Sequence, residues 1–230
     1  MNLLEDLPDD LIGYLIETLC KVSKVSLKVF AHVNKFCYHK TAQFAIEHEI
    51  CRSLECHEIA AEGLLEVLKW AQSEGSEWDL RVCSNAARNG HMEILKWARS
   101  QGCHWDFKVC SNAARNGHIE ILKWARSEGC EWTYLTCAAL ALTGNLESLK
   151  WARSEGAPWN SCTTAWAAYN GHLHVLQWAV SNGCRLSRSV CTNAIKNGHL
   201  ELLIWARANG CEWDVKTETL AKQKWPNIFN

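Results

Sequence analysis

The sequence predicts an all-α fold in which short helical hairpins stack on one another to form a solenoid. A period of 27 residues runs from residue 64 to residue 214, and tryptophan carries it in two columns. Each period also holds a helix-capping side chain and two glycines at fixed places. Self-similarity at such a period is the signature of repeat proteins, whose units bury their apolar faces against each other. The two columns are Trp70, Trp97, Trp124, Trp151, Trp178 and Trp205, and then Trp78, Trp105, Trp132, Trp159, Leu186 and Trp213.

The first helix of each unit is predicted to begin just after the second tryptophan column. A side chain that can accept a hydrogen bond from the free N–H groups of a first helical turn stands there in every unit. These capping candidates are Asp79, Asp106, Thr133, Asn160, Ser187 and Asp214. The helix is expected to end at a glycine, where a left-handed backbone conformation costs little. The glycines at this place are Gly90, Gly117, Gly144, Gly171 and Gly198.

The second helix is predicted to follow at once and to end at the next glycine. It is entered through His91, His118, Asn145, His172 or His199. Its apolar residues recur near helical spacing, while charged residues such as Glu93 and Lys96 stand on the other side. Because two short helices cannot bury their own apolar faces, each hairpin must stack on its neighbours. We therefore expect the indole rings, each with about 150–250 Å² to bury, to lie inside the stack.

The ends of the array differ from the internal units. Residues 54–63 form a degenerate first unit, in which Gly63 is in register with Gly90. Residues 215–224 repeat a first helix only, and Pro226 then prevents its continuation. Lys222 and Lys224 replace inner residues of this last helix, which indicates a polar terminal cap. Residues 51–230 are thus predicted to form six helical hairpins and a half-unit cap.

The unit resembles an ankyrin repeat. The ankyrin pattern A-A-x-N-G-H-L-E-V-V-K is matched at residues 86–96 and again at residues 113–123. An ankyrin unit has 33 residues, and the unit of this chain has 27. The missing residues fall between Trp105 and Val109, where ankyrins place a β-hairpin finger. The resemblance implies ankyrin-related hairpins without the finger, so that binding would fall to the concave helical face.

Residues 1–50 lie outside the period and are predicted to form a separate helical segment. The run L-P-D-D-L-I-x-x-L-I-x-x-L, followed by F-A-x-V-N-K-F, resembles an F-box, the helical module by which adaptor proteins dock on Skp1. The resemblance implies that Skp1 is bound by Leu7, Pro8, Leu11, Ile12 and Ile16. The alternative is a helical cap that merely shields the first repeat.

No residue pattern indicates catalysis, a cofactor or a bound metal. Nine cysteines fall into two columns, and neighbours within a column would lie about one repeat apart, roughly 8–10 Å, too far for a disulfide or a shared zinc ion. We expect them to act as small buried apolar residues. The four histidines at the entry to the second helix are equivalent copies, which favours a structural role. The columns are Cys56, Cys83, Cys110, Cys137 and Cys191, and then Cys103, Cys130, Cys184 and Cys211.

The candidate partner-binding residues are those that vary between units. In the middle units these positions of the first helices become aromatic or apolar, with basic residues beside them, a composition typical of a protein-binding hot spot. The alternative for Trp166 is that it packs inward and fills space. The predicted surface consists of Arg88, Phe107, Arg115, Tyr134, Leu142, Trp166, Tyr169 and Lys196.

Composition narrows the classes of function. With 48% apolar and 21% charged residues and a net charge of −1, the chain has no overall field to attract nucleic acid or an anionic membrane. The first ten residues are acidic, and no apolar run approaches a membrane span. We expect a soluble cytoplasmic monomer that binds proteins and is not an enzyme.

The two resemblances together imply a substrate adaptor of a cullin-type ubiquitin ligase, with Skp1 at the N-terminal segment and an unknown substrate on the repeats. The alternative is a non-catalytic scaffold or decoy with no link to ubiquitin. An F-box-like start followed by short tryptophan-rich units also resembles proteins of large DNA viruses, and this resemblance implies a site of action in the host cytoplasm.

Overall fold

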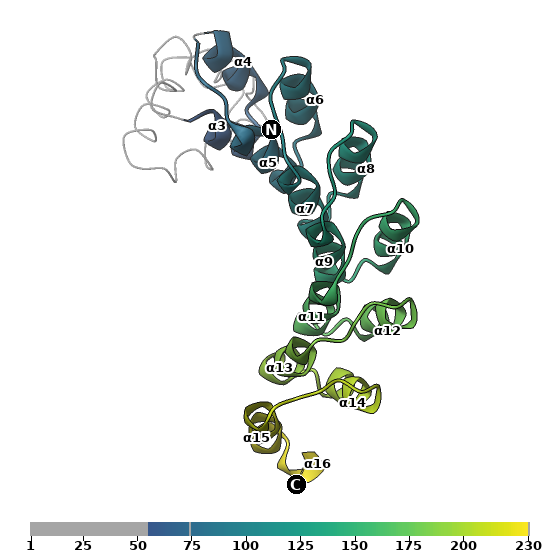
Figure 1. Cartoon of the computed structure of the whole chain (residues 1–230). Helices are drawn as coiled ribbons and strands as arrows, with labels where there is room; N and C mark the ends of the chain where they lie inside the picture. Colours follow the sequence, from purple (N-terminus) through teal and green to yellow (C-terminus); the bar gives the residue numbers. More distant parts are fainter. Residues whose placement is uncertain (1–54, 74, 230) are drawn as a thin grey trace, which may run out of the picture. The chain divides into compact units, whose positions relative to one another are not determined.

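The computed structural model describes residues 55–73 and 75–229, and all regular structure in these ranges is helical (Figure 1). The predicted all-α class is therefore confirmed, and the ankyrin-type β-hairpin finger is absent from this part of the chain. The predicted Skp1-binding residues lie outside the described residues. The helices are α3 (Cys56–Glu62), α4 (Leu65–Ser73), α5 (Leu80–Asn89), α6 (Met92–Ser100), α7 (Lys108–Arg115), α8 (Ile119–Ser127), α9 (Tyr134–Thr143), α10 (Leu146–Ser154), α11 (Ser161–Tyr169), α12 (Leu173–Ser181), α13 (Arg188–Asn197), α14 (Leu200–Ala208), α15 (Val215–Lys224) and α16 (Pro226–Phe229).

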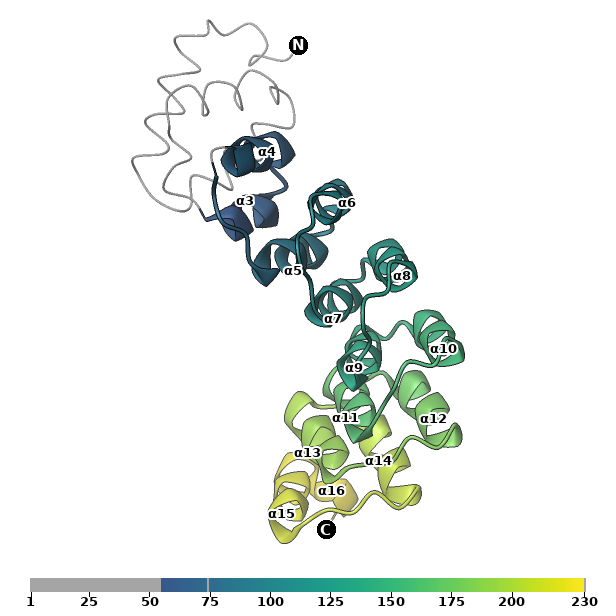
Figure 2. The ribbon, with the colours of Figure 1, turned by 45° about the horizontal axis from the view of Figure 1, so that its top comes forward.

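The chain divides into two units after Asp106, and both are built from the same helical hairpin. In the first unit α3 packs against α4 and α5, and α5 against α6. In the second unit the first helices of successive hairpins, α7, α9, α11, α13 and α15, follow one another in one row, and α8, α10, α12 and α14 lie in a second row (Figures 1 and 2). This two-layer arrangement is a solenoid of stacked hairpins.

The first helices begin largely where the capping pattern predicts. Four side chains accept a hydrogen bond from the first turn, those of Asp79, Thr133, Asn160 and Asp214. Asp106 also stands directly before helical backbone, because Phe107 already has helical angles (φ −53°, ψ −18°). The prediction of a capping bond is wrong for Ser187, which precedes α13 but makes no such bond, and whose Oγ is buried without a partner.

The core between the two rows consists of aliphatic and small side chains. The second helix of each hairpin carries a leucine at the same position, and each of these leucines is fully buried. Alanine and cysteine fill the facing positions of the first helices, and the nine column cysteines are all buried, as expected of small apolar residues. The recurring leucines are Leu68, Leu95, Leu122, Leu149, Leu176 and Leu203.

The tryptophans do not occupy this core, which corrects the expectation that they fill the interior. All 13 lie in the described part of the chain, and each is half-buried. The physical reason is the size of their neighbours, because alanine pairs bring the helices close together and leave no room for an indole between them. The rings lie instead at the edge of the stack, where one side of each tryptophan can remain exposed to solvent.

At this edge the rings form a ladder with arginine. Within a hairpin, the ring before the first helix packs on the ring of the second helix, with centroids 5.5 Å apart for Trp132 and Trp151 and 5.7 Å apart for Trp159 and Trp178. Between hairpins, the guanidinium of Arg153 on α10 lies 4.2 Å from the ring centroid of Trp159, a cation–π contact. Equivalent contacts join Arg99 to Trp105, Arg126 to Trp132 and Arg207 to Trp213.

The ladder also explains the one break in the second tryptophan column. Leu186 stands there, and the residue that would supply the cation is Val180 instead of arginine. The aromatic ring and its cation are therefore replaced together by two apolar residues. This paired replacement is consistent with a contact between ring and cation, although Trp78 in the first unit keeps its ring with Gln72 at the arginine position.

Histidine joins three of the hairpins to the one before. The Nε2–H group of His199, at the start of α14, donates to the carbonyl of Tyr169 at the end of α11, at 3.1 Å. His91 and His172 make the same bond to the carbonyls of Ala61 and Leu142, which confirms their structural role. The end of α13 receives no such bond from a histidine of a following hairpin, and there the Nζ of Lys224 on α15 donates to the carbonyl of Ile195 at 2.6 Å. The polar cap predicted for the last helix is thus confirmed.

Candidate functional site

An asparagine ladder between the first helices is interrupted in the middle of the second unit. The amide of Asn193 on α13 donates to the carbonyl of Ala165 on α11 at 2.9 Å, and Asn85 donates in the same way to His57 in the first unit, at 3.1 Å. The equivalent positions on α9 and α11 hold Ala139 and Trp166, which carry no amide. These two helices therefore forgo a bond that the repeat makes elsewhere.

A groove opens where the ladder is interrupted, and we call it the Trp166 groove. It is formed by α7, α9 and α11, has a volume of about 420 Å³, and contains no acidic side chain in its lining. Its lining residues are Phe107, Lys108, Ser111, Asn112, Arg115, Leu135, Ala138, Ala139, Leu142 and Trp166.

The ring of Trp166 lies in an aromatic and basic cluster. It meets the ring of Tyr169 at a centroid distance of 5.5 Å and an interplanar angle of 66°. From α7, the guanidinium of Arg115 lies 5.7 Å from the Trp166 ring centroid. The Trp166 indole is half-buried, so part of the ring packs against the protein and part is exposed to solvent. It forms one wall of the groove.

Four of the predicted surface residues meet in this groove: Phe107, Arg115, Leu142 and Trp166. Tyr169 adjoins them through its ring contact and is 44% exposed. The structure does not bring the other three into the lining.

Each of these three is exposed elsewhere. Tyr134 stands at the start of α9 with 41% exposure, and Lys196 lies on α13. Arg88 is on α5 of the first unit, whose placement relative to the groove is not defined.

Sequence reasoning missed six lining residues, of which Ala139 is the most informative. Its alanine departs from the asparagine found at 85, 112 and 193, and this departure was visible by aligning the repeats. Lys108, Ser111 and Leu135 carry no such signal, because only the packing of α7 on α9 turns them toward the same space.

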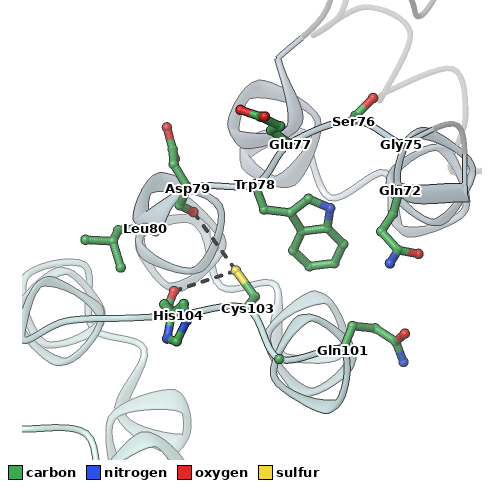
Figure 3. Close-up of a pocket in the computed structure, with 11 residues that line it drawn as sticks. Gln72, Gly75, Ser76, Glu77, Trp78, Asp79, Leu80, Gln101, Cys103 and His104 are labelled. Carbon is green, nitrogen blue, oxygen red and sulfur yellow. Dashed lines mark hydrogen bonds between the residues drawn. The ribbon is translucent and has the colours of Figure 1, made fainter.

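A second hollow, in the first unit, is lined mainly by turns. Figure 3 shows the indole of Trp78 with Gln72 and Gln101 on one side and Asp79, Cys103 and His104 on the other. Gln72 takes the place of the ladder arginine, so the Trp78 ring has no guanidinium from that position. The thiol of Cys103 points toward the backbone carbonyls of Asp79 and His104, at 4.0 and 3.6 Å. These contacts hold the turn together.

The described residues carry neither a membrane-spanning helix nor a metal cluster. None of their helices has the length and apolar character needed to cross a bilayer. Among them there is also no group of three or more His, Cys, Asp or Glu side chains placed to hold a metal ion.

Comparison with solved structures defines the class of the fold. No protein-family model and no curated protein sequence matches the chain. The fold is that of a helical-repeat solenoid of the ankyrin type. It is similar to the human ASB11 ankyrin repeat domain, with a TM-score of 0.52 and 14% identity over 68% of this chain and 84% of that one.

A weaker similarity is to the pentatricopeptide repeat protein PPR10, solved in complex with an 18-nt psaJ RNA element. Here the TM-score is 0.43 and the identity 12%, over 98% of this chain and 39% of that one.

Proposed function

We propose that this chain is a protein-binding module and that the Trp166 groove holds a segment of its partner. The observation that carries the proposal is the interruption of the asparagine ladder. An asparagine at position 139 or 166 would add a hydrogen bond between neighbouring helices, worth about 0.5–1.5 kcal/mol. The chain has instead a small residue that leaves a hollow and a large ring that borders it. Giving up stability at one place is typical of a functional site.

The walls of the groove fit an apolar side chain that is followed by an acidic one. Leu135, Ala138, Ala139 and Leu142 supply an apolar lining. The guanidinium of Arg115 lies 5.7 Å from the Trp166 ring centroid, and its planar set of N–H donors matches a carboxylate. Aromatic residues and arginine are the residue types that most often dominate binding energy at protein interfaces. We therefore expect a peptide ligand in which a large apolar residue lies beside Asp or Glu.

Two repair variants separate binding from folding. Trp166→Asn would let the new amide donate to the carbonyl of Ala138, as Asn193 does to Ala165. Ala139→Asn would direct an amide toward the carbonyl of Ser111 in the same way. Trp166→Asn exchanges the contacts of the half-buried ring for this hydrogen bond and removes one wall of the groove, whereas Ala139→Asn fills the hollow; both variants are expected to fold. Tyr134→Ala, at an exposed position outside the lining, is the matched control.

The probe is a random peptide library displayed on phage, selected on the full chain after depletion on the W166N variant. We expect enriched peptides with an apolar residue beside an acidic one, and at least tenfold tighter binding to the unchanged chain and to Y134A than to W166N or A139N. Peptides that bind all four equally, or an absence of enrichment, would contradict the proposal. Loss of folding in W166N would instead assign the ring to the core.

The adaptor function is a second proposal, which rests on the F-box resemblance of residues 1–50. In this proposal Leu7, Pro8, Leu11, Ile12 and Ile16 recruit Skp1, while the Trp166 groove selects the substrate of a cullin-type ubiquitin ligase in the cytoplasm. Co-purification with Skp1 that disappears in a chain carrying Leu7→Ala and Pro8→Ala supports it. Failure of the unchanged chain to bind Skp1 favours the alternative of a scaffold or decoy.

A further inference from the structure

Cysteines from the two columns meet in pairs within single hairpins. In the hairpin of α13 and α14, the Sγ atoms of Cys191 and Cys211 lie 3.0 Å apart, and both residues are buried. In the first unit the Sγ atoms of Cys83 and Cys103 lie 3.5 Å apart. The members of each pair are 20 residues apart in sequence. Comparison of residues one period apart does not reveal them, because it matches each cysteine with its own column.

The turn after α14 holds Cys211 against α13. The backbone N–H of Cys211 donates to the carbonyl of Ala206, closing the end of α14. Its thiol lies 3.3 Å from the carbonyl of Ser187, the residue that precedes α13. Arg207 donates to the Cys211 carbonyl. These contacts set the Cys211 sulfur beside the first turn of α13, where Cys191 points toward it.

The two thiols of this pair differ in acidity. The hydrogen bond from the Cys191 thiol lowers the pKa of Cys211 to about 7, and the positive charge of Arg207 acts in the same direction. That same contact, together with burial, raises the pKa of Cys191. Only the thiolate form is a nucleophile, so near neutral pH Cys211 is the attacking sulfur and Cys191 the sulfur that closes the bond.

We infer that Cys191 and Cys211 form a redox modification site, which a low-molecular-weight disulfide such as glutathione disulfide converts to a disulfide within the hairpin. The Cys211 thiolate attacks one sulfur of the small disulfide and releases the other as a thiolate, which takes up a proton. The resulting mixed disulfide is then attacked at the Cys211 sulfur by Cys191, which loses its proton, and the second small thiol leaves. Two protein thiols are oxidised, and one small disulfide is reduced to two thiols.

The geometry requires little movement for this reaction. The two sulfur atoms must approach from 3.0 Å to the bonded distance of about 2.05 Å. Cys211 lies in a turn between the exposed residues Gly210 and Glu212, so local opening of that turn admits a small reagent. The bond would join the start of α13 to the turn after α14 and so stabilise the last full hairpin of the array.

Three hairpins border the Trp166 groove, and two of them, α9 with α10 and α11 with α12, lack such a cysteine pair. Cys137 faces the backbone carbonyl of Ala157, at 3.8 Å, where other units have a second cysteine. Cys184 has Thr164 in place of its partner, and the Thr164 hydroxyl donates to the carbonyl of Arg185 at 2.8 Å. Cys184 is therefore a matched control: it is buried in the same turn of the preceding unit, and its thiol donates to the carbonyl of Asn160 at 3.2 Å instead of to a second cysteine.

The test incubates the reduced, folded full chain with glutathione buffers of rising oxidised fraction and maps its thiols by mass spectrometry. We expect a peptide pair linked through Cys191 and Cys211 with the loss of two hydrogens, and a rise in Tm of about 5 °C or more. In Cys191→Ala the second attack is impossible, so the glutathione adduct should accumulate on Cys211. Cys184→Ser should leave the crosslink unchanged.

Two results would overturn the inference. The first is a folded chain that forms no bond between Cys191 and Cys211 while the C191A variant also gains no adduct on Cys211. The second is linkage of these cysteines only after denaturation, or only between different molecules. Because C191A is read out by an adduct and the unchanged chain by a crosslink, poor folding of one variant does not leave the question open.

Discussion

Substituting alanine for Gly171 and for Gly198 should cost different amounts of stability, although both glycines end a first helix. Their backbones are alike, with φ of +74° and +83°. A Cβ on Gly171 would lie 2.5 Å from Nδ1 and 2.6 Å from Cε1 of His199, whereas the nearest atom to a Cβ on Gly198 is Nζ of Lys224, at 3.6 Å. No histidine ring packs against Gly198, which makes it a natural control for Gly171.

The magnitudes follow from these distances. An alanine at a left-handed position costs about 1–2 kcal/mol, and Gly198→Ala should cost no more than this. Gly171→Ala adds the overlap with the imidazole, and overpacking costs roughly 1–3 kcal/mol. The ring can move away only by giving up its bond to the Tyr169 carbonyl, which is worth about 0.5–1.5 kcal/mol. We expect Gly171→Ala to lose about 1–2 kcal/mol more than Gly198→Ala.

Urea unfolding of four variants measures this difference: G171A, G198A, H199A and the double variant G171A/H199A. On the H199A background, alanine at position 171 should cost only what alanine at position 198 costs, because the clashing ring is gone. Equal losses for the two single glycine variants would refute the reasoning. A difference that persists without the histidine would refute it as well.

Three further predictions concern the ladder, the cap and pH. Arg153→Ala should lower the free energy of unfolding by about 1–3 kcal/mol, because it removes the cation–π contact with Trp159 and the hydrogen bond to the Ala157 carbonyl. Arg188→Ala is the control, because it removes only an exposed ion pair, and it should change the free energy of unfolding in urea by less than about 1 kcal/mol. Lys224→Ala should speed amide hydrogen exchange in the last turn of α13, and unchanged exchange would show that the lysine is not a cap. Burial lowers the pKa of His172, so its contribution to stability is complete above about pH 6.5 and is lost as pH falls below that value; His172→Gln should flatten this part of a thermal-stability profile.

Helix ends were predictable from sequence because capping is a local interaction. Asp79 and Gly90 act within a few residues of α5, so their roles can be read from neighbouring letters. Phe107 follows Asp106 with helical backbone angles, so the start of α7 agrees with the same pattern. The role of the tryptophans was predicted wrongly, since the number of rings does not show how closely the alanine pairs bring the helices together.

The candidate site was predictable only in part. The aromatic and basic character of Arg115, Leu142 and Trp166 stood out as variation between repeats, and these residues do share a groove. Tyr134 has the same kind of signal yet stands outside the lining. The difference lies in the direction of each side chain on its helix and in the packing of one hairpin on the next.

By itself, the sequence determined the repeat length, the helical hairpin, the structural role of the recurring histidines and the polar last cap, because each of these depends on residues close together in the chain or on their exact recurrence. Only the tertiary structure decided which residues of α7, α9 and α11 line one groove and which thiols meet. Cys191 and Cys211 come together because α14 folds back on α13 and its last turn ends beside the first turn of that helix. Such contacts depend on the distance and rotation between packed helices, which no spacing along the chain specifies.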